Sequence, residues 1–233
     1  MNIGIFFRVG MLTIALCAVS AISAQEGKDR PKKRDPMPVY VTPYYDSKGP
    51  KVEVGEFSKK LASADAKSVL ELAAEMKKEK EKVRTEAMFV LAIRLYDLGH
   101  KDDAVYWFYT AQFRARLFAM ILDKEKIGGI GAPAFELRAA FGAFQQLSGE
   151  YINGYAFGEL PKLEKTLAAV LNENKKVADY SKIYPDVKFV STTSWAEKNT
   201  EVSTGLEKLV DLIKTKADFI KEQRKKNGIE GKY

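Results

Sequence analysis

Two chemically versatile residue types are nearly missing from this chain. Among 233 residues there is one cysteine, Cys17, and one histidine, His100. A single cysteine excludes a disulfide within the chain and argues against thiolate zinc sites and iron–sulfur clusters, which need several cysteines. A single histidine excludes metal sites built on paired histidines. A Ser-His-Asp catalyst would have to use His100, which we expect in an exposed turn. The sequence therefore predicts no metal, no cofactor and no catalytic residue.

Long apolar runs are also scarce, and the clearest one stands at the start of the chain. A charged start, an apolar core (Val9–Val19) and a small-residue end give residues 1–24 the pattern of a secretory signal peptide. We expect cleavage near Ala24, a periplasmic or secreted protein, and no transmembrane span afterwards. The alternatives are a membrane anchor, for which the run is short, and a lipoprotein at Cys17, for which Leu16 is a poor preceding residue.

Prolines are few, and most fall in one segment. Residues 25–56 contain Pro31, Pro36, Pro38, Pro43 and Pro50. Because proline interrupts the hydrogen bonds of a helix, we expect a linker or irregular arm here.

The same arm begins with a basic run, in a chain whose net charge is +7. After a signal peptide, such a run is typical of a weak contact with anionic lipid headgroups or another acidic surface, and the alternative is a solvated tail. We expect no nucleic-acid partner. The basic residues concerned are Lys28, Arg30, Lys32, Lys33 and Arg34.

The most regular pattern lies between residues 84 and 122, where two apolar helices are predicted on either side of Gly99. The second helix has two apolar stripes on opposite faces, which is typical of a helix sandwiched between neighbours. We expect Asp102 to cap this helix. The first stripe is Ala104, Trp107, Phe108, Ala111, Ala115, Phe118 and Leu122; the second is Tyr106, Tyr109, Phe113, Leu117 and Met120.

The residues of this hairpin resemble the tetratricopeptide repeat and its Sel1-like relative over one repeat, Thr85–Phe118. The matching positions are Leu91, Ala92, Gly99, Ala104, Trp107, Phe108 and Ala111. The resemblance implies an all-α fold in which antiparallel helical hairpins stack in a short array, and it implies a protein or peptide ligand. The alternative is an ordinary antiparallel helix pair in an unrelated bundle. Arg116 departs from the repeat pattern, since a proline usually ends the repeat there.

Further helical periods extend this domain over residues 57–233. The spacing predicts helices at Ala64–Lys78 with Ser63 as its cap, Pro133–Leu147, Pro161–Asn172 and Val202–Lys226. We expect solvated or loop structure at Lys77–Lys82, Ile127–Pro133, Tyr151–Phe157 and Asn174–Thr200, the last packed on the body with Asp186–Val190 extended. The glycine run Ile127–Pro133 has no Gly-Lys-Ser/Thr after it, so it favours a connection over a phosphate loop.

The flanks between the two stripes of the hairpin are where polar side chains stand. Arginine beside tyrosine is enriched at binding hot spots, because both give large contacts with directional hydrogen bonds. The alternative is that the arginines pair with Asp97, Asp103 or Glu136 and join helices. The predicted partner-binding residues are Arg94, Tyr106, Tyr109, Gln112, Arg114 and Arg116.

These observations predict an exported, non-enzymatic protein-binding module of the bacterial envelope. An assembly factor and an immunity-type inhibitor of a periplasmic toxin both fit, the second by analogy of fold. The alternative function is a cell-wall-acting hydrolase that uses two carboxylates. The pair Glu71 and Glu75 lies one turn apart on a lysine-rich helix, which favours solvated ion pairs.

Overall fold

The computed structural model describes residues 55–61 and 65–233, and in them the chain is helical. Its α-helices are α2 (Ser58–Leu61), α3 (Ala66–Lys78), α4 (Thr85–Asp97), α5 (Lys101–Ile121), α6 (Pro133–Ala156), α7 (Leu160–Glu173), α8 (Tyr180–Ile183), α9 (Trp195–Thr215) and α10 (Ala217–Lys226). Four short 3-10 helices join them: η1 (Gly55–Phe57), η2 (Lys80–Lys82), η3 (Lys124–Lys126) and η4 (Thr192–Ser194). In this part of the chain the only β pairing is an isolated bridge between Leu122 and Phe189. The all-α class is therefore confirmed for the described residues.

Some of the predictions fall outside those residues. They are the signal peptide (1–24), the basic run, almost all of the arm at 25–56, and the cap Ser63. Within the described ranges, no helix is both long enough and apolar enough to span a membrane.

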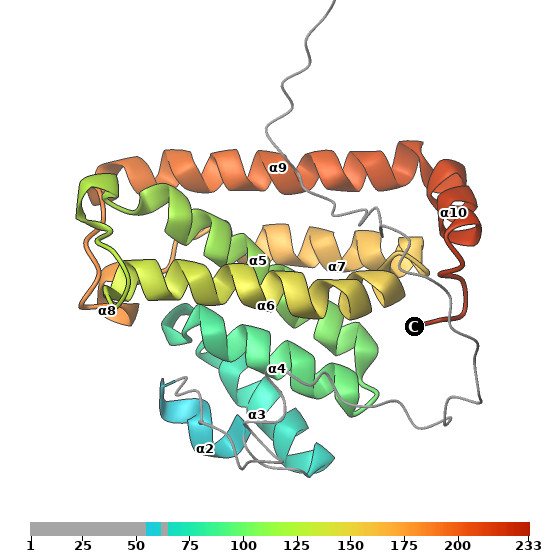
Figure 1. The fold of residues 1–233 in the computed structure, drawn as a ribbon, viewed down its shortest axis with the longest axis horizontal. Helices are drawn as coiled ribbons and strands as arrows, with labels where there is room; N and C mark the ends of the chain where they lie inside the picture. Colours follow the sequence, from blue (N-terminus) through green and yellow to red (C-terminus); the bar gives the residue numbers. More distant parts are fainter. Residues whose placement is uncertain (1–54, 62–64) are drawn as a thin grey trace, which may run out of the picture. The chain divides into compact units, whose positions relative to one another are not determined.

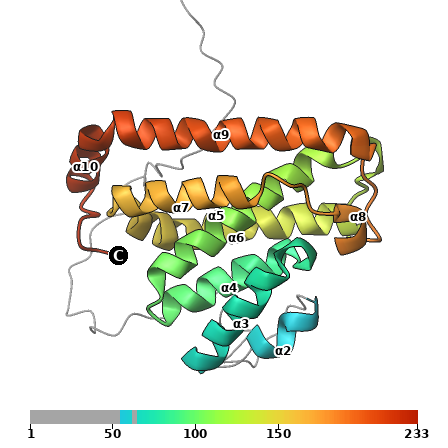
Figure 2. The same cartoon turned by 180° about the vertical axis from the view of Figure 1, so that it is seen from behind.

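The central helix of the fold is α5, as its two apolar stripes predict. It packs against α4, α6, α7 and α9, and Figures 1 and 2 show it running between α4 on one side and α9 on the other. Ala104 and Ala111 are fully buried, as are Phe108 and Phe118. An aromatic core surrounds them: Phe89 of α4 stacks on Phe144 of α6 at 5.4 Å between ring centres.

The pair α4–α5 forms the predicted hairpin. The turn between them contains Gly99, whose φ of +88° is left-handed and suits glycine. The next two helices do not repeat this arrangement, because α6 and α7 each pack more extensively on α5 than on one another. The stacking of successive hairpins into an array is thus not confirmed.

The N-terminus of α4 is capped by a distant side chain. The hydroxyl of Tyr184, just after α8, accepts a hydrogen bond from Thr85 N at 2.8 Å and donates to Glu86 Oε2 at 2.8 Å. Arg84 lies over the Tyr184 ring and pairs with the other oxygen of Glu86. The segment between α7 and α9, predicted as an ordered loop on the body, therefore fixes the start of the central hairpin. Its extended part is limited to the bridge at Phe189.

Helix α6 is longer than predicted and, up to Ala156, includes the segment Tyr151–Phe157 that we expected as a loop. Two glycines lie inside α6, and each stands where the helix meets an aromatic ring. A Cβ at Gly149 would stand 3.9 Å from Phe108, and one at Gly154 would stand 2.4 Å from the ring of Tyr233. Tertiary packing outweighs the weak helix propensity of glycine here.

The prediction of one last helix over Val202–Lys226 is wrong in two respects: the helix starts earlier, and the segment forms two helices instead of one. Helix α9 already begins at Trp195, and the chain breaks at Lys216 (φ −122°, ψ 24°) before α10. The sequence did not indicate the first two turns of α9, because the polar residue Asn199 occupies an inward position where the apolar pattern would need an apolar residue. It is buried and donates to the carbonyl of Asn174 at 3.0 Å.

Helix α3 is capped by Asp65, whose carboxylate accepts from Ser68 N at 2.8 Å. Its inward residues are Val69, Leu72 and Met76, whereas Leu70 is 36% exposed. Asp102, predicted to cap α5, makes no cap bond. It accepts hydrogen bonds from Tyr155 and Lys162, and His100 occupies the cap position without a side-chain cap bond.

Candidate functional site

Half of the predicted partner-binding residues are buried in the structure. Arg94 is 1% exposed, and Arg114 and Tyr109 are each 4% exposed. Tyr106, Gln112 and Arg116 are half-buried. The flanks of α5 are therefore more covered than the spacing suggested, and only the last three residues keep surface that a partner could contact.

Arg114 is covered by contacts from other segments of the chain. Its guanidinium donates to the carbonyl of Val83 at 3.2 Å, rather than pairing with Asp97, Asp103 or Glu136. The hydroxyl of Tyr180 donates to the backbone carbonyl of Arg114 at 3.0 Å, so the segment after α7 covers this side of α5. Burial lowers the pKa of Arg114 from its ordinary value.

Tyr109, on the same helix, is bonded inward as well. Its hydroxyl donates to Asn153 Oδ1 on α6 at 3.0 Å, and burial raises its pKa. Beside it, Gln112 and Arg116 line a small crevice against Val202 and Leu206 of α9.

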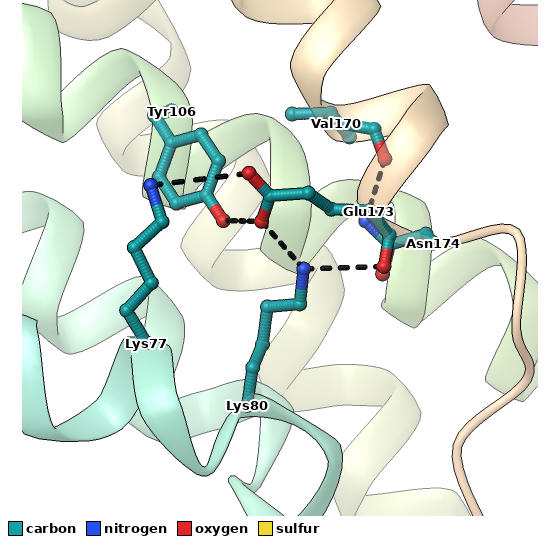
Figure 3. A network of polar contacts seen from close by, with 6 residues as sticks. All are labelled: Lys77, Lys80, Tyr106, Val170, Glu173 and Asn174. Carbon is teal, nitrogen blue, oxygen red and sulfur yellow. Dashed lines mark hydrogen bonds and ion pairs between the residues drawn. The ribbon is translucent and has the colours of Figure 1, made fainter.

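An unpredicted cluster of charged groups lies where α3, α5 and α7 meet (Figure 3). The Glu173 cluster consists of Lys77 at the end of α3, Lys80 in η2, Tyr106 on α5 and Glu173, the last residue of α7. Lys80 Nζ donates to Glu173 Oε2 at 2.7 Å and to the backbone carbonyl of Glu173 at 3.2 Å. The Tyr106 hydroxyl donates to the same carboxylate oxygen at 2.5 Å, and Lys77 Nζ lies 3.8 Å from the other oxygen.

The cluster joins elements that are distant in the sequence. Lys80 and Glu173 are 93 residues apart, yet the lysine side chain is only 10% exposed. The carbonyl that Lys80 contacts belongs to the last turn of α7, where helix carbonyls lack partners and the helix dipole favours a cation. Lys80 thus satisfies a helix end and a carboxylate at once. The expectation that Lys77–Lys82 forms a solvated turn is wrong at this residue.

The ionisation of the cluster follows from burial and pairing. Desolvation lowers the pKa of Lys80, although Glu173 counteracts this, and it raises the pKa of Tyr106. Partial burial alone would raise the pKa of Glu173, but its hydrogen bonds from Lys80 and Tyr106 outweigh this and hold the pKa below its ordinary value. At neutral pH the cluster is therefore a carboxylate held between two ammonium groups and a neutral phenol.

This geometry favours a structural role for the cluster over a catalytic one. A lysine acts as a nucleophile or base through a free lone pair, which desolvation helps to expose. Here Lys80 Nζ is charged and directed at two acceptors from Glu173. The carboxylate is likewise occupied by three donors.

The carboxylates Glu71 and Glu75 of α3 are ion-paired at the surface. Glu71 and Glu75 line an open depression of about 300 Å³ beside Lys60 and Leu72. Glu75 pairs with Lys60, and Glu71 lies 3.9 Å from Lys67. This agrees with the solvated pairs that the sequence indicated. Nowhere in residues 55–61 and 65–233 do three or more His, Cys, Asp or Glu side chains gather as metal ligands would.

The glycine run before α6 forms a defined turn that presents an apolar side chain. Ala132 N donates to Gly129 O at 3.0 Å, and Gly131 has a φ of +88°, which is the geometry of a type II turn with Ile130 at its first central position. Gly131 N donates to Glu136 Oε1 at 2.7 Å. A carboxylate occupies this N–H and would repel a phosphate, so the turn is not a phosphate loop. Ile130 is 92% exposed.

Two more exposed apolar residues lie on segments at this end of the fold, Phe135 at the start of α6 and Val190 before α9. The segment that carries Val190 is bonded to the end of α5: Val190 N donates to Ile121 O at 2.9 Å, and Asp123 N donates to Lys188 O at 3.1 Å. Figures 1 and 2 both show the start of α6 and the start of α9 at the same end of the helices. We call Ile130, Phe135 and Val190 the apolar end.

Comparison with known proteins gives one distant similarity. A protein of Haemophilus influenzae described as "Uncharacterized protein" is 27% identical to this chain over 232 residues, covering 97% of this chain and 83% of the relative. No protein-family model matches the chain, and no solved structure matches it.

Proposed function

We propose that this chain is an exported, non-enzymatic protein-binding module of the bacterial envelope, either an assembly factor or an immunity-type inhibitor of a toxin. The observation that carries the proposal is Ile130, an apolar side chain that a fixed turn holds in solvent. The leader pattern of residues 1–24 supports export. The similarity to a protein of Haemophilus influenzae along nearly the whole chain supports a bacterial setting.

A binding function accounts for Ile130 better than folding does. Burying an isoleucine side chain contributes about 1.5–3 kcal/mol, and this fold leaves that contribution unused. The turn is not loose, since Gly131 N and Ala132 N both have backbone or side-chain acceptors. An apolar anchor on a preformed turn loses little conformational entropy when it enters a partner's pocket.

The surroundings of Ile130 fit the usual composition of an interface. Phe135 and Val190 add partly exposed apolar area, and the exposed charged residues Lys124, Glu125 and Lys126 of η3 stand beside the run. Apolar anchors surrounded by a polar rim are the pattern that concentrates binding energy in a few residues. Gln112 and Arg116, half-exposed on α5, remain proposed contacts of a second, more polar region.

The test is a comparison of proteins captured from the native envelope by the wild-type chain and by Ile130→Ser. We expect the variant to keep its melting temperature, because exposed substitutions change stability by no more than about 0.5 kcal/mol, and to lose the main captured protein. Leu70→Ser is the matched control, since Leu70 is a partly exposed leucine on α3. It should retain the partner. Equal retention by Ile130→Ser and Leu70→Ser would contradict the proposal, and Arg116→Ala in the same capture tests the second region.

A further inference from the structure

The last residues of the chain fold back onto α6, near the C-terminal end of that helix. Gly228 and Gly231 have left-handed backbone, with φ of +61° and +72°, and they turn the segment after α10 back toward the body. The ring of Tyr233 then lies against the backbone of Gly154, where a Cβ would stand 2.4 Å from the ring. Figures 1 and 2 both show the C-terminus near the end of α6. Only glycine at position 154 leaves room for this tyrosine.

The same turn of α6 offers polar and aromatic contacts to the tail. Glu150 stands one turn before Gly154 on the same face of the helix. Its Oε1 accepts hydrogen bonds from the Tyr233 hydroxyl at 2.6 Å and from Lys232 Nζ at 3.1 Å. The ring of Tyr151 meets the Tyr233 ring edge to face, at 6.1 Å between ring centres. We call Glu150, Tyr151 and Gly154 the Gly154 site, and its contacts fit a tyrosine that follows a lysine.

The tail is docked at this site without being buried in the core. Tyr233 is half-buried, and the side chains of Lys232 and Glu150 are 49% and 62% exposed. No residue of α10, which leads into the tail, is buried, and Arg224 ties this helix to α6 by donating from Nη1 to Gly154 O at 2.8 Å. Exposed ion pairs contribute little to stability, and segments that bury little apolar surface open locally while the core stays folded. The tail therefore leaves the site at a small cost in free energy.

We propose that the Gly154 site binds a segment of a partner protein in which a tyrosine follows a basic residue, and that Lys232 and Tyr233 close the site as an autoinhibitory strap. The strap shows the chemistry of the ligand, because it brings a ring against bare backbone and directs a phenol hydroxyl and an ammonium group at one carboxylate. The site lies at the opposite end of α6 from Ile130. This contact is therefore separate from the one on which the proposed function depends.

A partner's segment fits the site better than the tail of a second copy does. A tail on a short linker meets its own site at an effective concentration in the millimolar range, so an identical tail from another copy gains nothing over it. A partner's segment can add contacts along α6. Leu147, two turns before Gly154 on the same face, is 40% exposed, and α6 carries no charged residue between Arg138 and Glu150. The outward side of α6 thus offers a longer segment apolar contact without repulsion.

The test uses the chain as isolated from cells and a peptide with the sequence of residues 228–233, Gly-Ile-Glu-Gly-Lys-Tyr. Saturation-transfer NMR measures the dissociation constant. A double variant, Lys232→Ala with Tyr233→Ala, opens the site, and we expect it to bind the peptide with a Kd on the order of 1 mM. The wild type should bind about tenfold more weakly, because its own strap competes. A peptide with phenylalanine in place of tyrosine loses the bond to Glu150 and should bind the double variant about tenfold more weakly.

Two glycine substitutions on α6 locate the binding site. Added to the double variant, Gly154→Ala places a methyl group where the tyrosine ring lies and should weaken peptide binding by at least about tenfold. Gly142→Ala is the matched control, since Gly142 is exposed on the same helix and a Cβ there would have no atom within 4 Å. It should bind the peptide as the double variant does. Both replacements raise the helix propensity of α6 alike, so neither is expected to unfold it.

The proposal is overturned if the double variant does not bind the peptide, if the wild type binds it equally well, or if Gly154→Ala and Gly142→Ala have the same effect. A wild-type dimer at micromolar concentration in analytical ultracentrifugation, lost in the double variant, would also overturn it, because the tail would then exchange between copies. Ile130→Ser, added to the double variant, should leave peptide binding unchanged. Failure at this site is therefore distinguishable from failure of the proposed function.

Discussion

Two charged runs of similar composition differ in burial: one contributes a buried lysine to the fold, and the other is exposed or half-buried throughout. Lys77–Lys82 and Lys221–Lys226 both follow an amphipathic helical pattern, and in both of them basic residues predominate. Lys80, in the first run, is 9% exposed and joins α7 to η2, whereas no residue of α10 is buried. The difference lies in what another segment supplies: Glu173 brings a carboxylate and a helix-end carbonyl to Lys80. A lysine is buried where its charge and its hydrogen bonds are satisfied, and only the tertiary structure shows where that is.

The largest expected effect comes from removing the group that permits Lys80 to be buried. Glu173→Ala should lower the free energy of unfolding by about 2–3 kcal/mol, because the buried ammonium of Lys80 then keeps only a backbone acceptor. Urea unfolding measures the change. Glu222→Ala is the matched control in the exposed run: it breaks the surface pair with Lys226 and should cost no more than about 0.5 kcal/mol. Equal costs would mean that the Glu173 cluster is no more coupled than a surface pair.

Acid should weaken the same contact by a smaller amount. Because the pKa of Glu173 is below its ordinary 4.5 in the folded chain, its stabilising contribution is complete above pH 4.5 and is lost as the pH falls through the lowered value. Protonation leaves both carboxyl oxygens in place, so the loss is smaller than that caused by truncation. Urea unfolding between about pH 3 and pH 6 should show a shallower acid decline for Glu173→Gln than for the wild type.

Other carboxylates with lowered pKa values, such as Asp102 and Asp179, titrate in both of these proteins and cancel in the comparison. The measurement therefore isolates Glu173. Identical acid slopes for the two proteins would contradict the assignment.

The parts of the fold that the sequence predicted are those with local signals. The two stripes of α5 and the glycine after α4 define the central hairpin to within a few residues, and α7 follows from Leu163, Leu167 and Val170. Both signals depend only on neighbours three or four positions away. They identify helices reliably without showing what covers each face.

What the sequence did not predict depends on segments far apart in the chain. The flank of α5 that carries Arg114 is polar in the sequence, but Tyr180 and the segment after α7 bury it. Asn199 interrupts the apolar pattern of α9 because its partner is the carbonyl of Asn174, and Gly154 lies within a helix because Tyr233 packs on it. The candidate site was missed for the same reason, since a lysine run indicates solvent until Glu173 is placed beside it.

The smallest expected change comes from replacing both members of the buried pair. Lys80→Met and Glu173→Met together should leave the free energy of unfolding within about 1 kcal/mol of the wild type, although Glu173→Met alone is costly. The double variant buries no charge, and methionine can fill the space of either side chain. Tyr106 and Lys77 are not fully buried, so each can bond to water instead of Glu173. The four proteins form a double-mutant cycle measured by urea unfolding. If the loss in free energy of unfolding of the double variant equals the sum of the losses of the two single variants, Lys80 and Glu173 are not energetically coupled. The buried run would then differ from the surface run only in its burial.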